Sequence, residues 1–196
     1  MATIDVSVAS STDDGHESAT DTTDNAASSA SIDTTGVWLF TRFNGITIPA
    51  GATITAAYLS FSIDGPGQDE PDVVFYGEDS ATPATLTAGL GNSNISNRAR
   101  TTASVDWANT NLGAPAVFNT PDLSTIVQEL VDSYAPYSSG DMAFVATTKN
   151  GTATRDLNVA MWDHATSAAP ALHIEYTEAG GATVARVHTL TTLGVQ

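Results

Sequence analysis

The chain has 196 residues, no cysteine, and 22 acidic against 6 basic side chains, which give a formal net charge of -16. Such a surface repels nucleic-acid phosphates and anionic membranes, so we expect no nucleic-acid partner and no membrane insertion, while solubility at high salt, as in a halophile, fits it well. The absence of cysteine excludes disulfides and thiolate metal sites, and the length fits one domain with arms.

The N-terminal part alternates over residues 3–8 and predicts a first strand. Residues 9–35 contain almost no large apolar side chains, so we expect a long acidic loop or a partly disordered arm there. No basic stretch followed by an apolar one opens the chain, which predicts no export signal in the sequence as written.

Residues 37–43 and 54–63 alternate with period 2, and Ile-Pro-Ala-Gly-Ala-Thr lies between them, which predicts a hairpin-like pair of strands. The first strand is apolar on both faces, with Trp38 and Phe40 on one and Leu39 and Phe43 on the other. It is therefore buried on both sides within the fold, or buried on one side and set against a partner subunit on the other.

Further strands are predicted at 72–78, 100–107, 142–148, 155–162 and 171–177. Residues 80–99 have little pattern and are expected to form a long surface connection. An Asn-Gly pair at 150–151 favours a hairpin turn between two of the strands.

One amphipathic helix is predicted at about residues 122–134. Its apolar side chains recur at helical spacing from Leu123 to Tyr134, Thr120 or Asp122 can cap its start, and Pro136 ends it.

Short strands without alternating helices predict an all-β fold, an antiparallel β-sandwich or jelly roll with one helix. We divide the chain into residues 1–35, a strand plus an acidic Ser/Thr-rich loop or arm; residues 36–177, the sandwich; and residues 178–196, a tail. The tail opens at a Gly-Gly pair and could form a last strand or an arm that pairs with another chain.

Four segments resemble the DNRLRE-type β-sandwich domains, jelly-roll modules of bacterial surface proteins, some carbohydrate-binding modules and some viral structural proteins. The segments are RFNGITIPAGATITAAYLSFSI, RTTASVDW, TPDLSTIVQELVDSYAPYSSGDMAFVAT and APALHIEYT. The resemblance covers about residues 36–177 and implies the fold. The Asn-Arg-Leu-Arg-Glu signature itself is absent, so the resemblance implies no binding residues.

Two acidic loops are calcium candidates, because calcium takes six to eight oxygen ligands from carboxylates, carbonyls and water. Solvated acidic loops are the alternative, and EF-hand spacing is absent. The candidate ligands are Asp13, Asp14 and Glu17 in the first loop, and Asp64, Asp69 and Asp72 in the second.

A mixed oxygen and imidazole site could form if Asp13 or Asp14 folds near Asp163 and His164. The histidines lack zinc-site spacing, no nucleophile elbow is present, and no carboxylate pair stands out, which indicates a protein that is not an enzyme.

We therefore expect a virion structural protein of a tailed virus, at the virion surface as a capsid decoration, turret or tail-associated subunit. It would assemble as a homo-oligomer, a trimer among the options, with other virion proteins as partners. The alternative is an extracellular carbohydrate-binding or adhesion module that presents aromatic rings to a glycan, and a polysaccharide-active enzyme is a third, weaker option.

Overall fold

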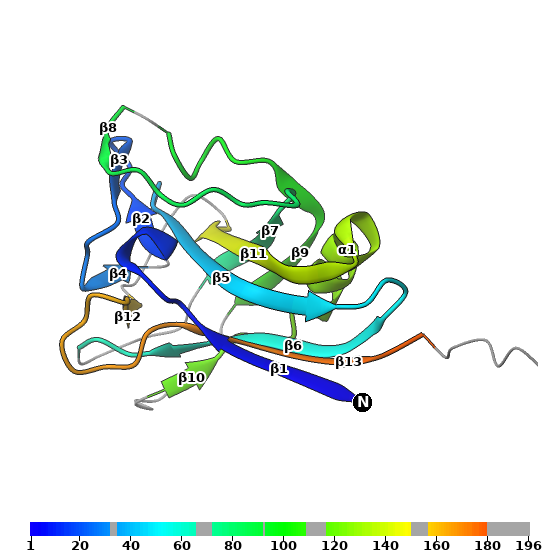
Figure 1. Cartoon of the computed structure of the whole chain (residues 1–196). Coiled ribbons are helices and arrows are strands. Elements are labelled where there is room, and N and C mark those ends of the chain that lie inside the picture. Colours follow the sequence, from blue (N-terminus) through cyan, green and yellow to red (C-terminus); the bar gives the residue numbers. More distant parts are fainter. Residues whose placement is uncertain (32–34, 66–71, 92, 109–116, 150–156, 180–196) are drawn as a thin grey trace, which may run out of the picture.

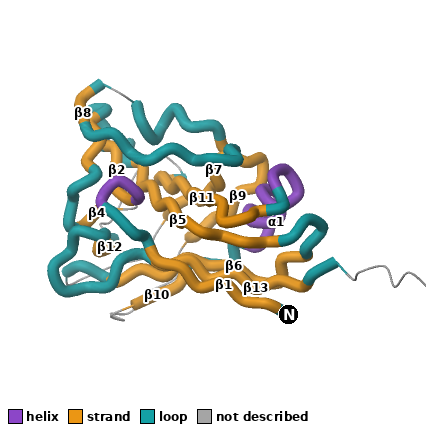
Figure 2. The backbone as a smooth tube through the Cα atoms, in the orientation of Figure 1, coloured by secondary structure: helices purple, strands orange, loops and turns teal. Residues whose placement is uncertain are grey.

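The computed structural model describes residues 1–31, 35–65, 72–91, 93–108, 117–149 and 157–179, and the expected all-β sandwich with one helix is confirmed (Figures 1 and 2). In chain order the elements are β1 (Ala2–Ser7), the 3-10 turn η1 (Ser11–Asp13), β2 (Asp14–Glu17), β3 (Thr22–Asp24), β4 (Ser29–Ser31), β5 (Trp38–Ile48), β6 (Thr53–Ser62), β7 (Asp72–Glu78), β8 (Gly89–Leu90), β9 (Arg100–Ala108), β10 (Val117–Asn119), α1 (Ser124–Tyr134), β11 (Tyr137–Thr148), β12 (Asn158–Ala160) and β13 (Ala171–Thr177).

Two antiparallel sheets form the sandwich. One has four strands in the order β1-β13-β6-β10, and the other has seven in the order β8-β3-β2-β5-β11-β7-β9. Their inner faces enclose the main core, in which Phe43 and Phe144 meet edge to face with ring centroids 6.1 Å apart. Phe61 stacks on Phe118 at 5.8 Å. Burial of these rings supplies much of the hydrophobic stabilisation.

The predicted hairpin across residues 37–63 is wrong in its pairing. Both strands exist, but β5 belongs to the seven-stranded sheet and β6 to the four-stranded sheet. Pro49 and Gly51, whose φ is 75°, lie in the turn that carries the chain from one sheet to the other. Period-2 alternation shows which side chains of a strand share a face, but it does not determine which strands pair with it. The sequence pattern therefore predicted the strands without their pairing.

Residues 9–31 hold more regular structure than the expected loop or arm, because η1, β2, β3 and β4 all lie there. β2 pairs with β5 and extends the seven-stranded sheet. Main-chain pairing and buried carboxylates, rather than large apolar side chains, secure this region. Gly15 in β2 has a φ of 151°, and a Cβ atom there would lie 2.3 Å from the Asp24 carbonyl oxygen, so the position requires glycine.

The predicted helix is confirmed as α1. Its residues Ile126, Val127, Leu130 and Val131 are buried at one end of the sandwich. Asp122 accepts hydrogen bonds from the main-chain amide and the hydroxyl of Ser124, which secures the first turn. Among the described residues, no helix has both the length and the apolar character needed to cross a bilayer.

The same helix covers part of one edge of the seven-stranded sheet. β9 is the last strand of that sheet, and the Glu129 carboxylate accepts the main-chain amides of Thr102 and Ala103 at 2.8 and 2.7 Å. These hydrogen bonds, that from Ala103 first, lower the pKa of Glu129 below its ordinary value. A side chain from α1 thus occupies amides that an added strand would otherwise use.

The long connection 79–99 covers the outer face of the seven-stranded sheet. Its residues Leu86 and Ile95 form a second core with Phe40, Ala143 and Val145. In β5, Leu39 and Phe43 point into the main core and Phe40 points outward under this cover. Of the two alternatives for this doubly apolar strand, burial within the fold is therefore the one observed.

The strand predicted at 155–162 is short, and it pairs with β4 rather than with β11. The expected hairpin through Asn150 and Gly151 is therefore wrong in its strand pairing, and both of these residues lie outside the described part of the chain.

Candidate functional site

The first acidic loop is built into the fold, and Asp13 shows how. This residue ends η1 and is 3% exposed. One of its carboxylate oxygens pairs with the Arg42 guanidinium, and the other accepts hydrogen bonds from Asn44 Nδ2 at 3.0 Å and Ser10 Oγ at 2.9 Å. Asp13 therefore anchors η1 to β5.

Arg42 is the centre of this arrangement. Its Nη2 donates to Asp141 Oδ2 at 2.6 Å and its Nε donates to the Pro83 carbonyl oxygen at 2.8 Å, in addition to the pair with Asp13. One arginine thus joins η1, β5, β11 and the cover segment 79–99. A largely buried arginine requires carboxylate partners, so Asp13 and Asp141 have a structural explanation.

Asp14 is a buried carboxyl group with a strongly raised pKa. It is 1% exposed, and its Oδ2 accepts the main-chain amide of Trp162 at 2.8 Å. Burial raises its pKa from 3.8 to about 7, the Trp162 hydrogen bond opposes that rise, and the nearby charges of Asp163 and Asp13 add to it. Such a pKa in a cleft would suggest an acid or base catalyst, but this carboxyl is closed off from solvent.

Asp163 lies near Asp14, as the proposed mixed site requires, whereas His164 does not complete it. Ser11 Oγ donates to Asp163 Oδ1 at 3.0 Å, and the other oxygen, Oδ2, is buried without a partner. His164 Nδ1 accepts the Ser167 amide at 2.9 Å, and its Nε2 lies 3.5 Å from Asp64 Oδ1. The imidazole is thus directed to the second acidic loop.

Glu17, the third candidate of the first loop, is 3% exposed and acts on the cover segment. Its Oε2 accepts the main-chain amides of Ile95 at 2.7 Å and of Ser96 at 3.2 Å. The carboxylate thereby fixes the turn that presents Ile95 to the second core.

Two of the three candidates of the second loop, Asp64 and Asp72, lie in the described part of the chain. Asp64 follows β6 beside His164, and Asp72 begins β7 with its carbonyl oxygen accepting the Lys149 amide at 3.0 Å. Asp69 lies outside the described residues.

Within the described ranges, no group of three or more His, Asp or Glu side chains is arranged to hold a metal ion. Calcium binding stays a prediction. Removal of a calcium ion bound to the folded state should lower Tm, so an unchanged Tm in a chelator titration would contradict it.

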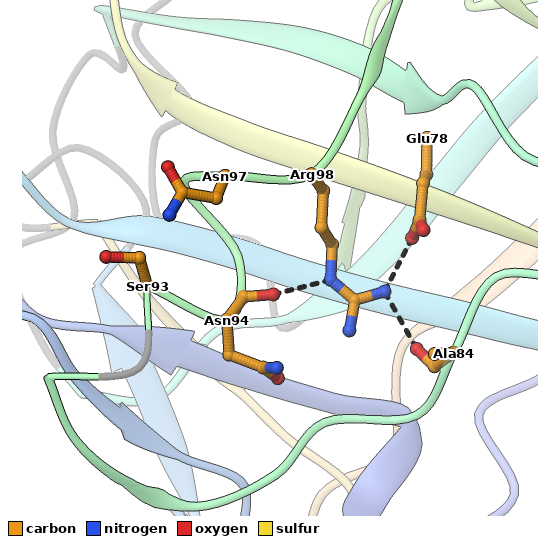
Figure 3. A pocket seen from close by; sticks show the side chains of 6 residues that line it. All are labelled: Glu78, Ala84, Ser93, Asn94, Asn97 and Arg98. Atoms are coloured by element: carbon orange, nitrogen blue, oxygen red, sulfur yellow. Dashed lines mark hydrogen bonds and ion pairs between the residues drawn. The ribbon is translucent and has the colours of Figure 1, made fainter.

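An open polar hollow of about 280 Å³ lies in the cover segment, lined by Glu78, Ala84, Ser93, Asn94, Asn97 and Arg98 (Figure 3). The Arg98 guanidinium lies 4.2 Å above the Phe40 ring and donates to Glu78 Oε2 at 2.6 Å and to the Ala84 carbonyl oxygen at 2.7 Å. Its Nε donates to the Asn94 carbonyl oxygen at 2.7 Å. The Arg98 charge is therefore balanced by Glu78 and by main-chain carbonyl oxygens of the protein itself. We accordingly assign the hollow to the packing of the cover segment.

The outer face of the four-stranded sheet differs, since polar side chains line it. Tyr58 on β6 stacks on its cross-strand neighbour His173 on β13, with ring centroids 4.6 Å apart and an interplanar angle of 19°. His173 Nδ1 lies 2.7 Å from Asp5 Oδ1 on β1, and His173 Nε2 lies 3.5 Å from Glu175. This face offers an aromatic pair surrounded by hydrogen-bonding groups.

The β1 edge of the same four-stranded sheet is the second part of this surface. β1 pairs with β13 over all six residues and is the last strand on its side. Its residues Ala2, Ile4 and Val6 pack against the main core but are only partly buried. Together, the Tyr58–His173 face and the outer edge of β1 form the candidate interaction surface.

The comparisons with known proteins assign no family to the chain. No family model matches the sequence, and no curated protein matches it.

The sequence pattern did not identify the anchoring role of Arg42 or the function of residues 79–99 as a cover. Isolated apolar residues such as Leu86 and Ile95 in a polar connection, facing a strand with two apolar sides, were the available signal.

Proposed function

We propose that the protein is a non-enzymatic structural subunit of a virion, located at the surface of a tailed virus as a capsid decoration, turret or tail-associated component. It would act by assembling with copies of itself and with other virion proteins. The observation that carries this proposal is the contrast between the two sheets, because the described residues cover one outer face and leave the other face and its β1 edge open.

The carboxylates and guanidinium groups support the same proposal. Arg42 binds one main-chain carbonyl oxygen and two carboxylates, and Arg98 binds main-chain carbonyl oxygens and one carboxylate. Glu17 binds main-chain amides, so these charged groups serve the architecture. A rigid scaffold with open strand positions is suited to assembly, since exposed strand edges pair readily with other chains.

Sedimentation velocity of the full chain over a range of concentration and salt tests the proposal. The charge of -16 makes copies repel one another, so association should strengthen as salt rises. A 20.2 kDa monomer at every concentration and salt would overturn the assembly function.

A second candidate is a carbohydrate-binding or adhesion module, and the Tyr58–His173 pair favours it. Aromatic rings stack on the apolar faces of sugars, while Asp5, Glu175 and the hydrogen-bonded Ser60 and Asn119 offer partners for hydroxyl groups. Glycan-array binding that Tyr58→Ala abolishes, by a chain that stays monomeric, would select this function over the first.

A further inference from the structure

The outer edge of β1 is a six-residue strand edge along which, among the described residues, no main-chain amide is seen to be occupied. The other terminal strands of the two sheets are β10 with three residues, β8 with two, and β9, where Glu129 occupies two amides. β1 has six residues in continuous register with β13, with no bulge, lysine or proline, and its one charged side chain, Asp5, is paired with His173 on the sheet face. Bulges, prolines and charged side chains are the devices by which proteins normally block an edge.

The direction of the free amides follows from the hydrogen-bond pattern. The Val8 amide donates to the Pro170 carbonyl oxygen on the β13 side at 2.9 Å. Because amides alternate sides along a strand, the even-numbered residues of β1 face β13 and the amides of Thr3, Asp5 and Ser7 face outward. Three main-chain donors are thus available to another strand.

The core beneath this edge is incompletely covered. Ile4 and Val6 point inward and pack against the main core, but both keep part of their surface exposed. A strand added beside β1 would bury that remaining surface and bond the three amides at the same time.

The C-terminal segment has the sequence for such a strand. Residues 180–196 lie outside the described part of the chain, and they are rich in Thr and Val and contain no proline. They hold Arg186 and no acidic side chain, whereas all 22 acidic side chains precede them, so the segment lacks the negative side chains that make copies repel one another. Extended, it spans roughly 55 Å, against roughly 20 Å for β1.

The position of the segment selects its partner. β13 ends at Thr177, and Tyr176 pairs with Ala2, so the segment follows directly from the corner where β1 begins. To pair with its own β1 it would turn back and run parallel to β1 in an antiparallel sheet, a slightly weaker arrangement. The same segment from another copy can approach in the antiparallel direction.

We propose that residues 180–196 of one copy add as a strand to the outer edge of β1 of a second copy. This inference rests on the proposed assembly function and names its interface. Each copy would donate one strand and accept one, a head-to-tail contact that forms a ring if it closes and a filament if it does not.

Full-length variants test the two sides of the contact separately. Thr3→Pro removes an outward amide without touching the β13 pairing, and Thr3→Ala, which keeps that amide, is its matched control. Val184→Pro/Val187→Pro disables the donor segment, with Val184→Ala/Val187→Ala as control. Sedimentation should show association weakened by about tenfold or more per lost main-chain hydrogen bond in the proline variants, and little changed in the alanine controls.

Mixing gives the decisive result. Each proline variant alone should associate at least about tenfold more weakly than wild type, yet together they should form a 1:1 complex of wild-type strength and nothing larger, because one retains the donor and the other the acceptor. Ser7→Pro replaces Thr3→Pro if thermal unfolding shows that the latter is misfolded.

Association that survives both proline changes would overturn the inference while leaving the assembly function in place. Loss of association only in Thr3→Pro would overturn the donor role and indicate pairing between two β1 edges. A wild-type chain that is monomeric throughout would remove the assembly function itself.

Discussion

On the outer side of the seven-stranded sheet, Phe40 lies beneath Ile95 and the guanidinium of Arg98, both supplied by the connection 79–99. On the outer side of the four-stranded sheet, Tyr58 and His173 stack on each other with polar neighbours. Both sheets are built from alternating strands. The difference teaches that side-chain chemistry on the outer face, rather than strand pattern, decides whether the chain must cover a sheet itself or can leave it open.

The covered face should depend most on its buried ion pair. Arg98→Ala leaves the Glu78 carboxylate, 11% exposed as a side chain, without its partner. Removal of one member of a buried pair costs about 3 to 5 kcal/mol of the free energy of unfolding. Urea denaturation measures this loss, and the double variant Arg98→Met/Glu78→Gln should recover much of it. An Arg98→Ala protein as stable as wild type would show that the cover is held by other contacts.

Asp14 should make the stability of the covered sheet depend on pH. Its pKa is about 7 when folded against 3.8 ordinarily, so between these values the folded state retains a proton that the unfolded state has lost. The associated stability is fully present below pH 3.8 and is lost as the pH rises through 7, by on the order of 4 kcal/mol at most.

Asp14→Asn removes this dependence because it keeps an oxygen for the Trp162 amide without a charge. It should be more stable than wild type at pH 8 and should give a flatter curve of unfolding free energy against pH. Asp132→Asn, an exposed substitution, controls for the loss of one acidic charge. Identical pH slopes for wild type and Asp14→Asn would refute the assignment.

The cover should also depend on its apolar contacts, to a smaller degree. Ile95→Val removes one methyl group from a fully buried side chain and should cost about 0.5 to 1.5 kcal/mol. Leu90→Ala lies in the same connection but is 76% exposed, and should change stability by less than about 0.5 kcal/mol. Thermal and urea unfolding of both variants measure the loss of unfolding free energy. Equal losses in Ile95→Val and Leu90→Ala would mean that Ile95 is not packed in the second core as described.

The open face should tolerate change best. Tyr58→Ala removes one cross-strand pair and should lower the free energy of unfolding by only about 0.2 to 1 kcal/mol. Ligand or partner binding should fall far more than stability if this face is functional. A loss of several kcal/mol would instead show that Tyr58 belongs to the core, and would end the contrast between the two faces.

Much of the fold follows from sequence because it depends on local pattern. Residues 37–43 and 54–63 alternate and are strands, and the helical spacing from Leu123 to Tyr134 is a helix. Their pairing depended on contacts that alternation does not encode, so β5 and β6 were placed in one hairpin although they belong to different sheets.

The candidate site was less predictable. The acidic residues near the N-terminus suggested cation binding, but Asp13 pairs with Arg42 in β5, and Arg42 also meets Asp141 far along the chain. Such partners are decided by topology. The Tyr58–His173 pair likewise exists only because the register places the two residues opposite each other.

Glu129 limits the number of strand edges through which a copy can accept a strand from a neighbour. By occupying the Thr102 and Ala103 amides, this carboxylate blocks that stretch of the nine-residue β9 edge, whereas β1 keeps its outward amides. A subunit with two open edges could accept a strand from each of two other copies, and such subunits can form branched networks. With that stretch of β9 blocked, the proposed donation of one strand to the β1 edge gives each copy one donor and one acceptor, so the assemblies built this way are unbranched rings or filaments.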